Sequence, residues 1–84
     1  MNQRLKRLEA MRNNPRADWT IGDVRAACSG LNVSCQPPSN GSHWTVSDPA
    51  MEEILTIPAR KPIKPPYIVA LIKFLDEVQK RRTP

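Results

Sequence analysis

The strongest constraint on this chain is an amphipathic stretch that follows two adjacent prolines, Pro65 and Pro66. Proline suits the first turn of a helix because the amide hydrogens of that turn have no partner within the helix. A basic run, residues 80–82, stands where the dipole of such a helix favours cations. Helical spacing predicts one apolar stripe, widened by Ile72 and made of Ile68, Leu71, Leu75 and Val78. We therefore expect a C-terminal helix whose apolar face is buried against a second layer.

A first helix is predicted over residues 2–13. Its apolar residues, Leu5, Leu8 and Met11, recur every three positions, and Asn13-Asn14-Pro15 provides a stop. Because this stripe is thin, we expect the helix to rest lightly on the rest of the domain or to meet a partner.

A second helix is predicted to start after Thr20, which is a good N-cap with Asp23 in the reciprocal capping position. Its apolar face comprises Ile21, Val24, Cys28 and Leu31. The helix should end near Gly30, since glycine is common at helix C-termini.

Three short strands are predicted between the second and the last helix, over residues 33–36, 43–47 and 53–57. Turn-forming residues separate them, and Pro58 should end the third strand because proline cannot continue the ladder of hydrogen bonds. In the second strand, alternation places His43 and Thr45 on one face and Trp44 and Val46 on the other. The second pair is the better candidate for the core, so we expect His43 to face solvent.

The order of these elements predicts an α+β fold with a three-stranded antiparallel sheet covered on one face by helices. At 84 residues the chain is long enough for one modest core. We expect one compact domain, in which a basic N-terminal helix (residues 1–16) precedes an α-β-β-β-α unit (residues 17–84).

The formal charge of +5 is unevenly distributed along the chain. Residues 1–16 carry a net charge of +4, residues 17–58 carry −4, and residues 59–84 carry +5. A polyanion would therefore meet the two ends of the chain. Solvation of two helices explains the same numbers, so charge alone does not select a function.

No apolar stretch approaches the ~20 residues that cross a bilayer, and the N-terminus lacks the apolar core of a signal peptide. We therefore expect a cytoplasmic protein. The two cysteines, Cys28 and Cys35, lack CxxC spacing and have a single histidine to accompany them. This predicts packed, reduced thiols and neither a metal site nor a cofactor.

Two segments carry the functional signal. The only histidine, His43, follows Gly41 and Ser42 in a turn that enters the second strand. A proline-rich segment before the last helix carries three cations, Arg60, Lys61 and Lys64. A titratable side chain together with a stiff cationic loop suggests phosphate chemistry on a polyanion.

The order of these segments resembles that of the HicA-type toxins of bacterial toxin–antitoxin pairs. The resemblance covers roughly residues 20–78 and rests on the Gly41-Ser42-His43 turn, the aspartate-proline after the strand, the Ile57-Pro58 end of the third strand, and the Lys61–Pro65 segment before the apolar helix. It implies a fold like that of double-stranded-RNA-binding domains (dsRBDs). It also implies a metal-independent mRNA endonuclease that is inhibited by a HicB-type antitoxin.

Within that resemblance His43 would be the catalytic group, Gly41 and Ser42 its supporting turn, and Lys61 and Lys64 part of a basic loop. RNA is cleaved without metal when a base takes the proton of a 2′-hydroxyl, which then attacks the adjacent phosphorus, and imidazole suits this step. Nearby cations stabilise the charge that develops on the phosphate. The sequence identifies no acid for the leaving group.

Other interpretations remain open at this stage. A histidine at a strand start is commonly a plain surface residue, and Arg60 either grips phosphate or is only solvated. The chain would then be a non-catalytic RNA-binding module of the same fold. Alternatively it is a protein-interaction domain that binds a partner helix through Leu5, Leu8 and Met11.

Overall fold

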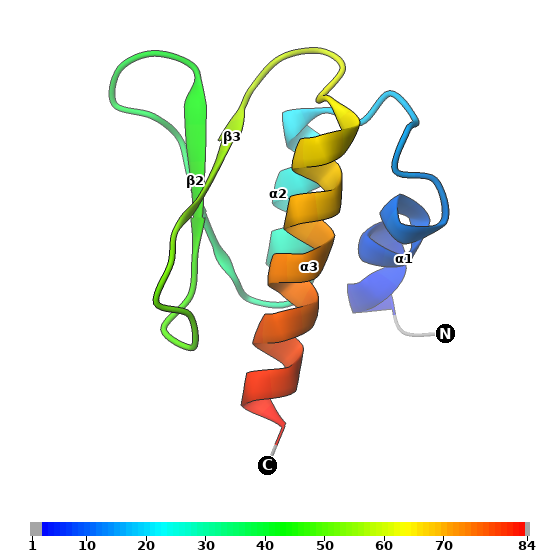
Figure 1. Ribbon diagram of the computed structural model, residues 1–84, viewed down its shortest axis with the longest axis vertical. Coiled ribbons are helices and arrows are strands. Elements are labelled where there is room, and N and C mark those ends of the chain that lie inside the picture. The colour runs from blue at the N-terminus through cyan, green and yellow to red at the C-terminus, as the bar shows by residue number, and fades with distance from the viewer. Residues whose placement is uncertain (1–2, 84) are drawn as a thin grey trace.

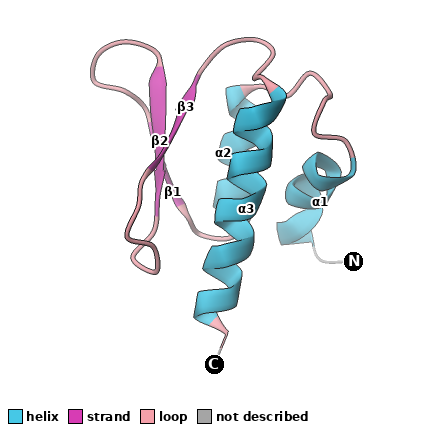
Figure 2. Ribbon diagram, in the orientation of Figure 1, coloured by secondary structure: helices cyan, strands magenta, loops and turns pink. Residues whose placement is uncertain are grey.

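A computed structural model describes residues 3–83 of the chain (Figures 1 and 2). The predicted start of the first helix at residue 2 and the last residue of the 17–84 unit lie outside the described residues. In chain order the elements are a 3₁₀ turn η1 (Gln3–Leu5), α1 (Lys6–Asn13), α2 (Ile21–Gly30), β1 (Ser34–Gln36), β2 (His43–Ser47), β3 (Leu55–Pro58) and α3 (Pro65–Arg82). The α+β class and the order of elements agree with the prediction.

The elements form three layers. The three strands make an antiparallel sheet in the order β1-β2-β3, and α2 and α3 cover one of its faces (Figures 1 and 2). Helix α1 lies on the far side of α2 and α3 from the sheet (Figure 1). Helix α3 is therefore buried on two sides, and it contributes six core residues: Ile68, Leu71, Ile72, Phe74, Leu75 and Val78.

The register of the sheet separates an apolar face from a polar one. Trp44 lies opposite Ile57 and Val46 opposite Leu55, and Val46 and Ile57 are fully buried under the helices. The alternate positions, which include His43, belong to the open face. The predicted division of the second strand into core-facing and solvent-facing residues is confirmed.

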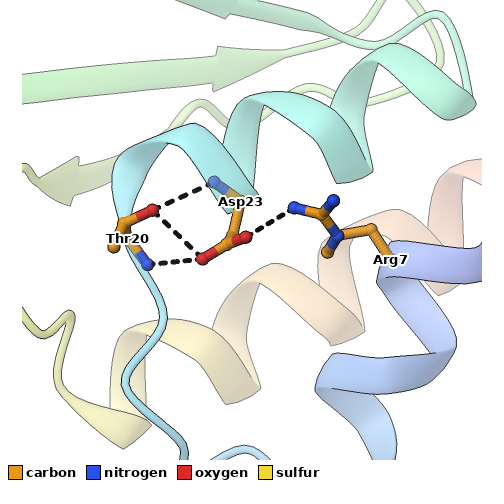
Figure 3. Close-up of polar contacts among 3 residues, drawn as sticks. All are labelled: Arg7, Thr20 and Asp23. Carbon is orange, nitrogen blue, oxygen red and sulfur yellow. Dashed lines mark hydrogen bonds and ion pairs between the residues drawn. The ribbon is translucent and has the colours of Figure 1, made fainter.

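Both ends of α2 are closed by local hydrogen bonds. The Thr20 side chain accepts from the Asp23 amide, and the Asp23 carboxylate accepts from the Thr20 amide, as predicted (Figure 3). At the other end the amide of Asn32 donates to the Ser29 carbonyl and the amide of Val33 to the Cys28 carbonyl. These two bonds form a Schellman motif in which Asn32, with φ of 56°, takes the left-handed position that glycine usually fills. Gly30 is thus the last residue of the helix and does not reverse the chain.

The expectation that the N-terminal helix rests lightly on the domain is wrong. Leu8 and Met11 are fully buried and belong to the single core cluster. They are therefore not available to bind a partner helix, which removes the main support for a protein-interaction surface at this position. A thin stripe suffices because α1 has polar contacts at its flanks as well as its two apolar anchors.

Ion pairs and a close backbone approach hold α1 in place. Arg7 contacts the Asp23 carboxylate at 2.5 Å (Figure 3), and Arg12 donates two hydrogen bonds of 2.7 Å to the carboxylate of Asp76 on α3. Arg4 lies against the end of α2, where its side chain donates to the carbonyl of Gly30. A methyl group at Gly30 would overlap the backbone carbonyl of Arg4. Glycine is required here by space.

The third strand begins later than predicted and includes Pro58. Residues 53 and 54 lie outside it because the preceding turn is longer: the Asp48 carboxylate accepts from the Ala50 amide and the Asp48 carbonyl from the Met51 amide. Pro58 pairs with His43 at the last position of the strand, which is possible because β3 is an edge strand.

The C-terminus of α3 is fastened to this turn. Arg82 pairs with the buried carboxylate of Asp48 at 2.5 Å, and its guanidinium also donates to the carbonyl of Leu31. None of the helices within residues 3–83 is long and apolar enough to cross a membrane.

We expect Gly30→Ala to destabilise the fold by about 1–3 kcal/mol, since overfilled contacts cost that much. The matched control is Gly22→Ala in the same helix, where the nearest atom, Thr20 Oγ1, would lie at an ordinary contact distance of 3.5 Å. That variant should be equally or more stable than the wild type, because alanine favours helix over glycine by up to about 1 kcal/mol. Urea unfolding monitored by tryptophan fluorescence measures both, and equal stability of the two variants would contradict the close approach.

Candidate functional site

A cavity of about 280 Å³ opens where β2 begins and β3 ends. Its lining comes from three segments: the turn before β2, the connection between β3 and α3, and the first turn of α3. The lining residues are Ser42, His43, Pro58, Arg60, Lys64 and Tyr67. In Figure 1 this is the end of the sheet at which the chain leaves β3 for α3.

His43 is held by the pairing of the two strands. It is the first residue of β2 and lies opposite Pro58. One step further, the amide of Ala59 donates a 2.8 Å hydrogen bond to the carbonyl of Ser42, which extends the pairing into the turn. Gly41 precedes this point with φ of +86°, a conformation that favours glycine. The backbone of His43 is therefore fixed while its side chain stays exposed.

The cationic segment between β3 and α3 is anchored to the core at one residue. Ile63 is fully buried, and its amide donates to the carbonyl of Trp19 at 2.9 Å. The Trp19 indole in turn donates to the Asn14 carbonyl at 2.8 Å. The segment of residues 60 to 64 is therefore fixed at one end by β3 and near the other by the buried Ile63. Lys64 follows as the N-cap of α3.

The N-terminus of α3 offers few amides to an anion. Pro65 and Pro66 occupy its first positions and have no amide hydrogen. The amides of Tyr67 and Ile68 both donate to the Lys64 carbonyl, at 3.0 and 3.4 Å. Positive charge at this cavity therefore comes from side chains and not from the helix end.

Pairing distinguishes the cations of the cavity from many others. Arg7, Arg12, Arg81 and Arg82 are committed to carboxylates of the fold. Arg60 and Lys64 are exposed, and among the described residues neither has an ion-pair partner. Their charge is available to a ligand, and no carboxylate lines the cavity.

The structure brings together most of the residues that the sequence nominated. His43, Ser42, Arg60 and Lys64 line one cavity. Lys61 is exposed but is not part of the lining. Gly41 lies in the turn before β2, next to the lining residue Ser42. His43 belongs to the open face of the sheet, but it is the first residue of β2. The cavity therefore lies at the end of the sheet, next to the start of α3, and not on the middle of the open face.

Sequence reasoning missed Tyr67. Its side chain is 37% exposed and lines the cavity with His43. It directly precedes Ile68, the first residue of the apolar stripe of α3, and is not itself part of that stripe. Its position directly after a proline pair, on the helix that follows the cationic segment, is the signal that would have found it.

Trp44 does not line this cavity. Its side chain is half-buried, and the guanidinium of Arg25 lies 5.6 Å from the centre of its ring. This contact across β2 and α2 is a cation–π interaction, so packing accounts for Trp44. Within residues 3–83 no three His, Cys, Asp or Glu side chains group in a way that could hold a metal ion.

Comparison of the chain with protein-family models, curated proteins and solved structures finds no match.

We expect Ile63→Ala to cost about 2–5 kcal/mol of stability, as is usual for a large side chain removed from a core. The loss should be accompanied by faster amide hydrogen exchange in residues 59–64 than in β2, because the anchor of the cationic segment is gone. Ile63→Val is the control and should cost about 0.5–1.5 kcal/mol. A uniform increase in exchange over the whole chain would show that Ile63 stabilises the domain without anchoring this segment in particular.

Proposed function

We propose that this chain is a HicA-type toxin, an endoribonuclease that cleaves mRNA without a metal ion and uses His43 as its general base. The observation that supports the proposal most is the cavity that His43 shares with two unpaired cations, Arg60 and Lys64. The α-β-β-β-α order from α2 to α3 fits the dsRBD-like fold that this proposal requires.

The cavity suits the binding of a phosphodiester. A phosphate group needs positive charge and hydrogen-bond donors, and Arg60, Lys64 and the Ser42 hydroxyl supply both. A volume of about 280 Å³ holds one nucleotide unit of a chain and not a folded duplex. Recognition would then rest on the backbone of a single strand that enters the cavity.

In the proposed reaction, the imidazole of His43 takes the proton of the 2′-hydroxyl, and the 2′-oxygen attacks the adjacent phosphorus. Arg60 and Lys64 stabilise the additional negative charge of the pentacoordinate state. The bond from phosphorus to the 5′-oxygen breaks, which leaves a 2′,3′-cyclic phosphate on one fragment and a 5′-hydroxyl on the other. Lys61, outside the lining, would meet a neighbouring phosphate of the same strand.

Tyr67 is the proposed proton donor for the leaving group, a role for which the sequence alone identified no residue. The departing 5′-oxygen needs a proton; Tyr67 lines the same cavity as His43, and a phenol hydroxyl is a hydrogen-bond and proton donor. We assign this role to Tyr67 because Arg60 remains charged throughout and is better suited to charge stabilisation than to proton transfer.

The proposal includes a partner and a location. A HicB-type antitoxin would inhibit the enzyme by covering the cavity, and acidic groups on the antitoxin would pair with the cations that the fold leaves free. The substrate is mRNA, which places the protein in the cytoplasm. The proposed mechanism needs no cofactor.

The direct test is incubation of end-labelled mRNA with the purified protein in excess EDTA. We expect the wild type to cleave and to leave 2′,3′-cyclic phosphate ends, and His43→Ala to be slower by about 100-fold or more, which is the usual contribution of a general base. His43 is exposed, so the variant should unfold at the same urea concentration as the wild type. If both proteins bind RNA and neither cleaves it, the chain is instead a non-catalytic RNA-binding module.

A second test addresses the two unpaired cations. In Arg60→Gln combined with Lys64→Gln, the salt dependence of RNA affinity should weaken by about 1.4 in slope, because each contact with single-stranded phosphate contributes about 0.7. The matched control is Lys80→Gln, an exposed cation at the far end of α3. Equal slopes for the two variants would place the RNA elsewhere.

The role of Tyr67 has its own test. Tyr67→Phe keeps the ring and removes the proton donor, so cleavage should slow by about 100-fold while RNA affinity is unchanged. A substrate in which sulfur replaces the 5′-bridging oxygen needs no acid, and it should be cleaved equally well by the variant and the wild type. Loss of affinity in Tyr67→Ala but normal cleavage by Tyr67→Phe would instead assign the ring to base stacking.

A further inference from the structure

A second hollow lies between α2 and β1. It has a volume of about 600 Å³, and its lining includes Arg25, Ala26, Ser29, Val33 and Cys35. Cys35 is half-buried on the edge strand β1 and is one of the residues that line this groove. A small reagent dissolved in water can therefore approach this residue.

Cys28 lies directly behind Cys35. It belongs to the last two turns of α2 and is fully buried in the core, and its side chain interacts with that of Cys35. Both cysteines are free thiols. The two residues are thus neighbours, one on the wall of the groove and the other inside the core.

The surroundings make the two thiols unequal. The interaction with the Cys28 side chain lowers the pKa of Cys35 while burial opposes the change, and the charge of Arg25 lowers it further. The same interaction and burial raise the pKa of Cys28. Of the two thiols, Cys35 is therefore the one that ionises more readily and the better nucleophile.

We propose that Cys35 is a site of oxidation by small hydroperoxides and that Cys28 resolves the oxidised product into an intramolecular disulfide. The three groups this requires are an accessible thiol, a cation beside it and a second thiol in contact with it. Cys35 and Arg25 line one groove, and Cys28 lies in the core beneath it and interacts with Cys35. This inference is independent of the proposed ribonuclease activity.

The chemistry balances in two steps. The Cys35 thiolate attacks one oxygen of the peroxide, the O–O bond breaks, and the products are Cys35 sulfenic acid and hydroxide, or the corresponding alkoxide. The Cys28 thiol then attacks the Cys35 sulfur, which forms the S–S bond and releases the sulfenic oxygen as water. Overall the two thiols are oxidised by two electrons and the peroxide is reduced by two.

Few backbone hydrogen bonds hold the strand that carries Cys35. Strand β1 has three residues and pairs only with β2. The connection from α2 to β1 is already short, because the Val33 amide donates to the Cys28 carbonyl itself.

The test uses the full chain, reduced and freed of reductant, with a slight excess of hydrogen peroxide at pH 7. Trypsin cleaves after Arg25 and next after Arg60, so residues 26–60 remain in one peptide that holds both cysteines. We expect this peptide to lose two hydrogen atoms in mass and to regain them with dithiothreitol. Peptide that gains oxygen with no loss of hydrogen, or a disulfide-linked dimer, would overturn the proposal.

Two variants assign the roles. Cys28→Ser keeps a donor beside Cys35 but cannot form a disulfide, so the sulfenic acid should persist and be captured by dimedone. Cys35→Ser should leave Cys28 reduced because Cys28 is buried. Dimedone capture at neither position, or oxidation of Cys28 in the absence of Cys35, would contradict the assignment.

A rate measurement keeps the test independent of those substitutions. In the wild type, alkylation of Cys35 by iodoacetamide at pH 6 should be faster than that of glutathione, because a lowered pKa raises the thiolate fraction more than it reduces the nucleophilicity of the thiolate. Arg25→Gln should slow it, whereas Arg16→Gln, remote from the groove, should not. A rate equal to that of glutathione would remove the basis for selective oxidation.

Discussion

Burial of α3 on two sides is the interaction on which the rest of the structure depends. One side of the helix packs on the sheet and the other on α1, so the apolar residues of this one helix join all three layers. Both ends of α3 are also fixed. The N-terminal end follows the buried Ile63, and the C-terminal end is tied to the turn after β2 by the Arg82–Asp48 pair. Because the cavity lies at the N-terminal end, the position of its side chains is set by the same packing that stabilises the domain.

Local signals were sufficient to predict most of the fold. The capping residues of α2, the alternation in β2 and the proline pair before α3 each act over a few residues, and each gave the correct element. One error concerns a contact between distant segments and the other a local turn. The close approach of Arg4 to Gly30 depends on how α1 meets α2, and the late start of β3 depends on the hydrogen bonds that Asp48 accepts from Ala50 and Met51. Neither is visible in periodicity, since the first needs the tertiary arrangement and the second depends on the hydrogen bonds of a turn.

The candidate site was predictable to a similar extent and for a similar reason. His43 and the cationic segment are distinctive in the sequence, so they were found, and the fold brings them to one cavity. Which cations enter that cavity was not predictable. Arg60 and Lys64 line it while Lys61, between them, does not, because Ile63 must turn inward to the core. Tyr67 enters the cavity only because the first turn of α3 is directed there.

The distribution of charge shows why net charge is a poor guide to a binding surface in so small a protein. The two basic ends of the sequence look alike in composition, yet their arginines have different tasks. Arg7 and Arg12 hold α1 to the acidic side chains of α2 and α3, and Arg82 neutralises a buried carboxylate. Each is satisfied by the fold and has little attraction left for an anion. The cations at the cavity, Arg60 and Lys64, have no carboxylate partner among the described residues. A phosphate that binds them would displace only water, whereas one that binds a paired arginine would have to displace a carboxylate. Affinity for a polyanion should therefore concentrate at the two cavity cations, Arg60 and Lys64. The arginines that pair with carboxylates should contribute mainly to stability.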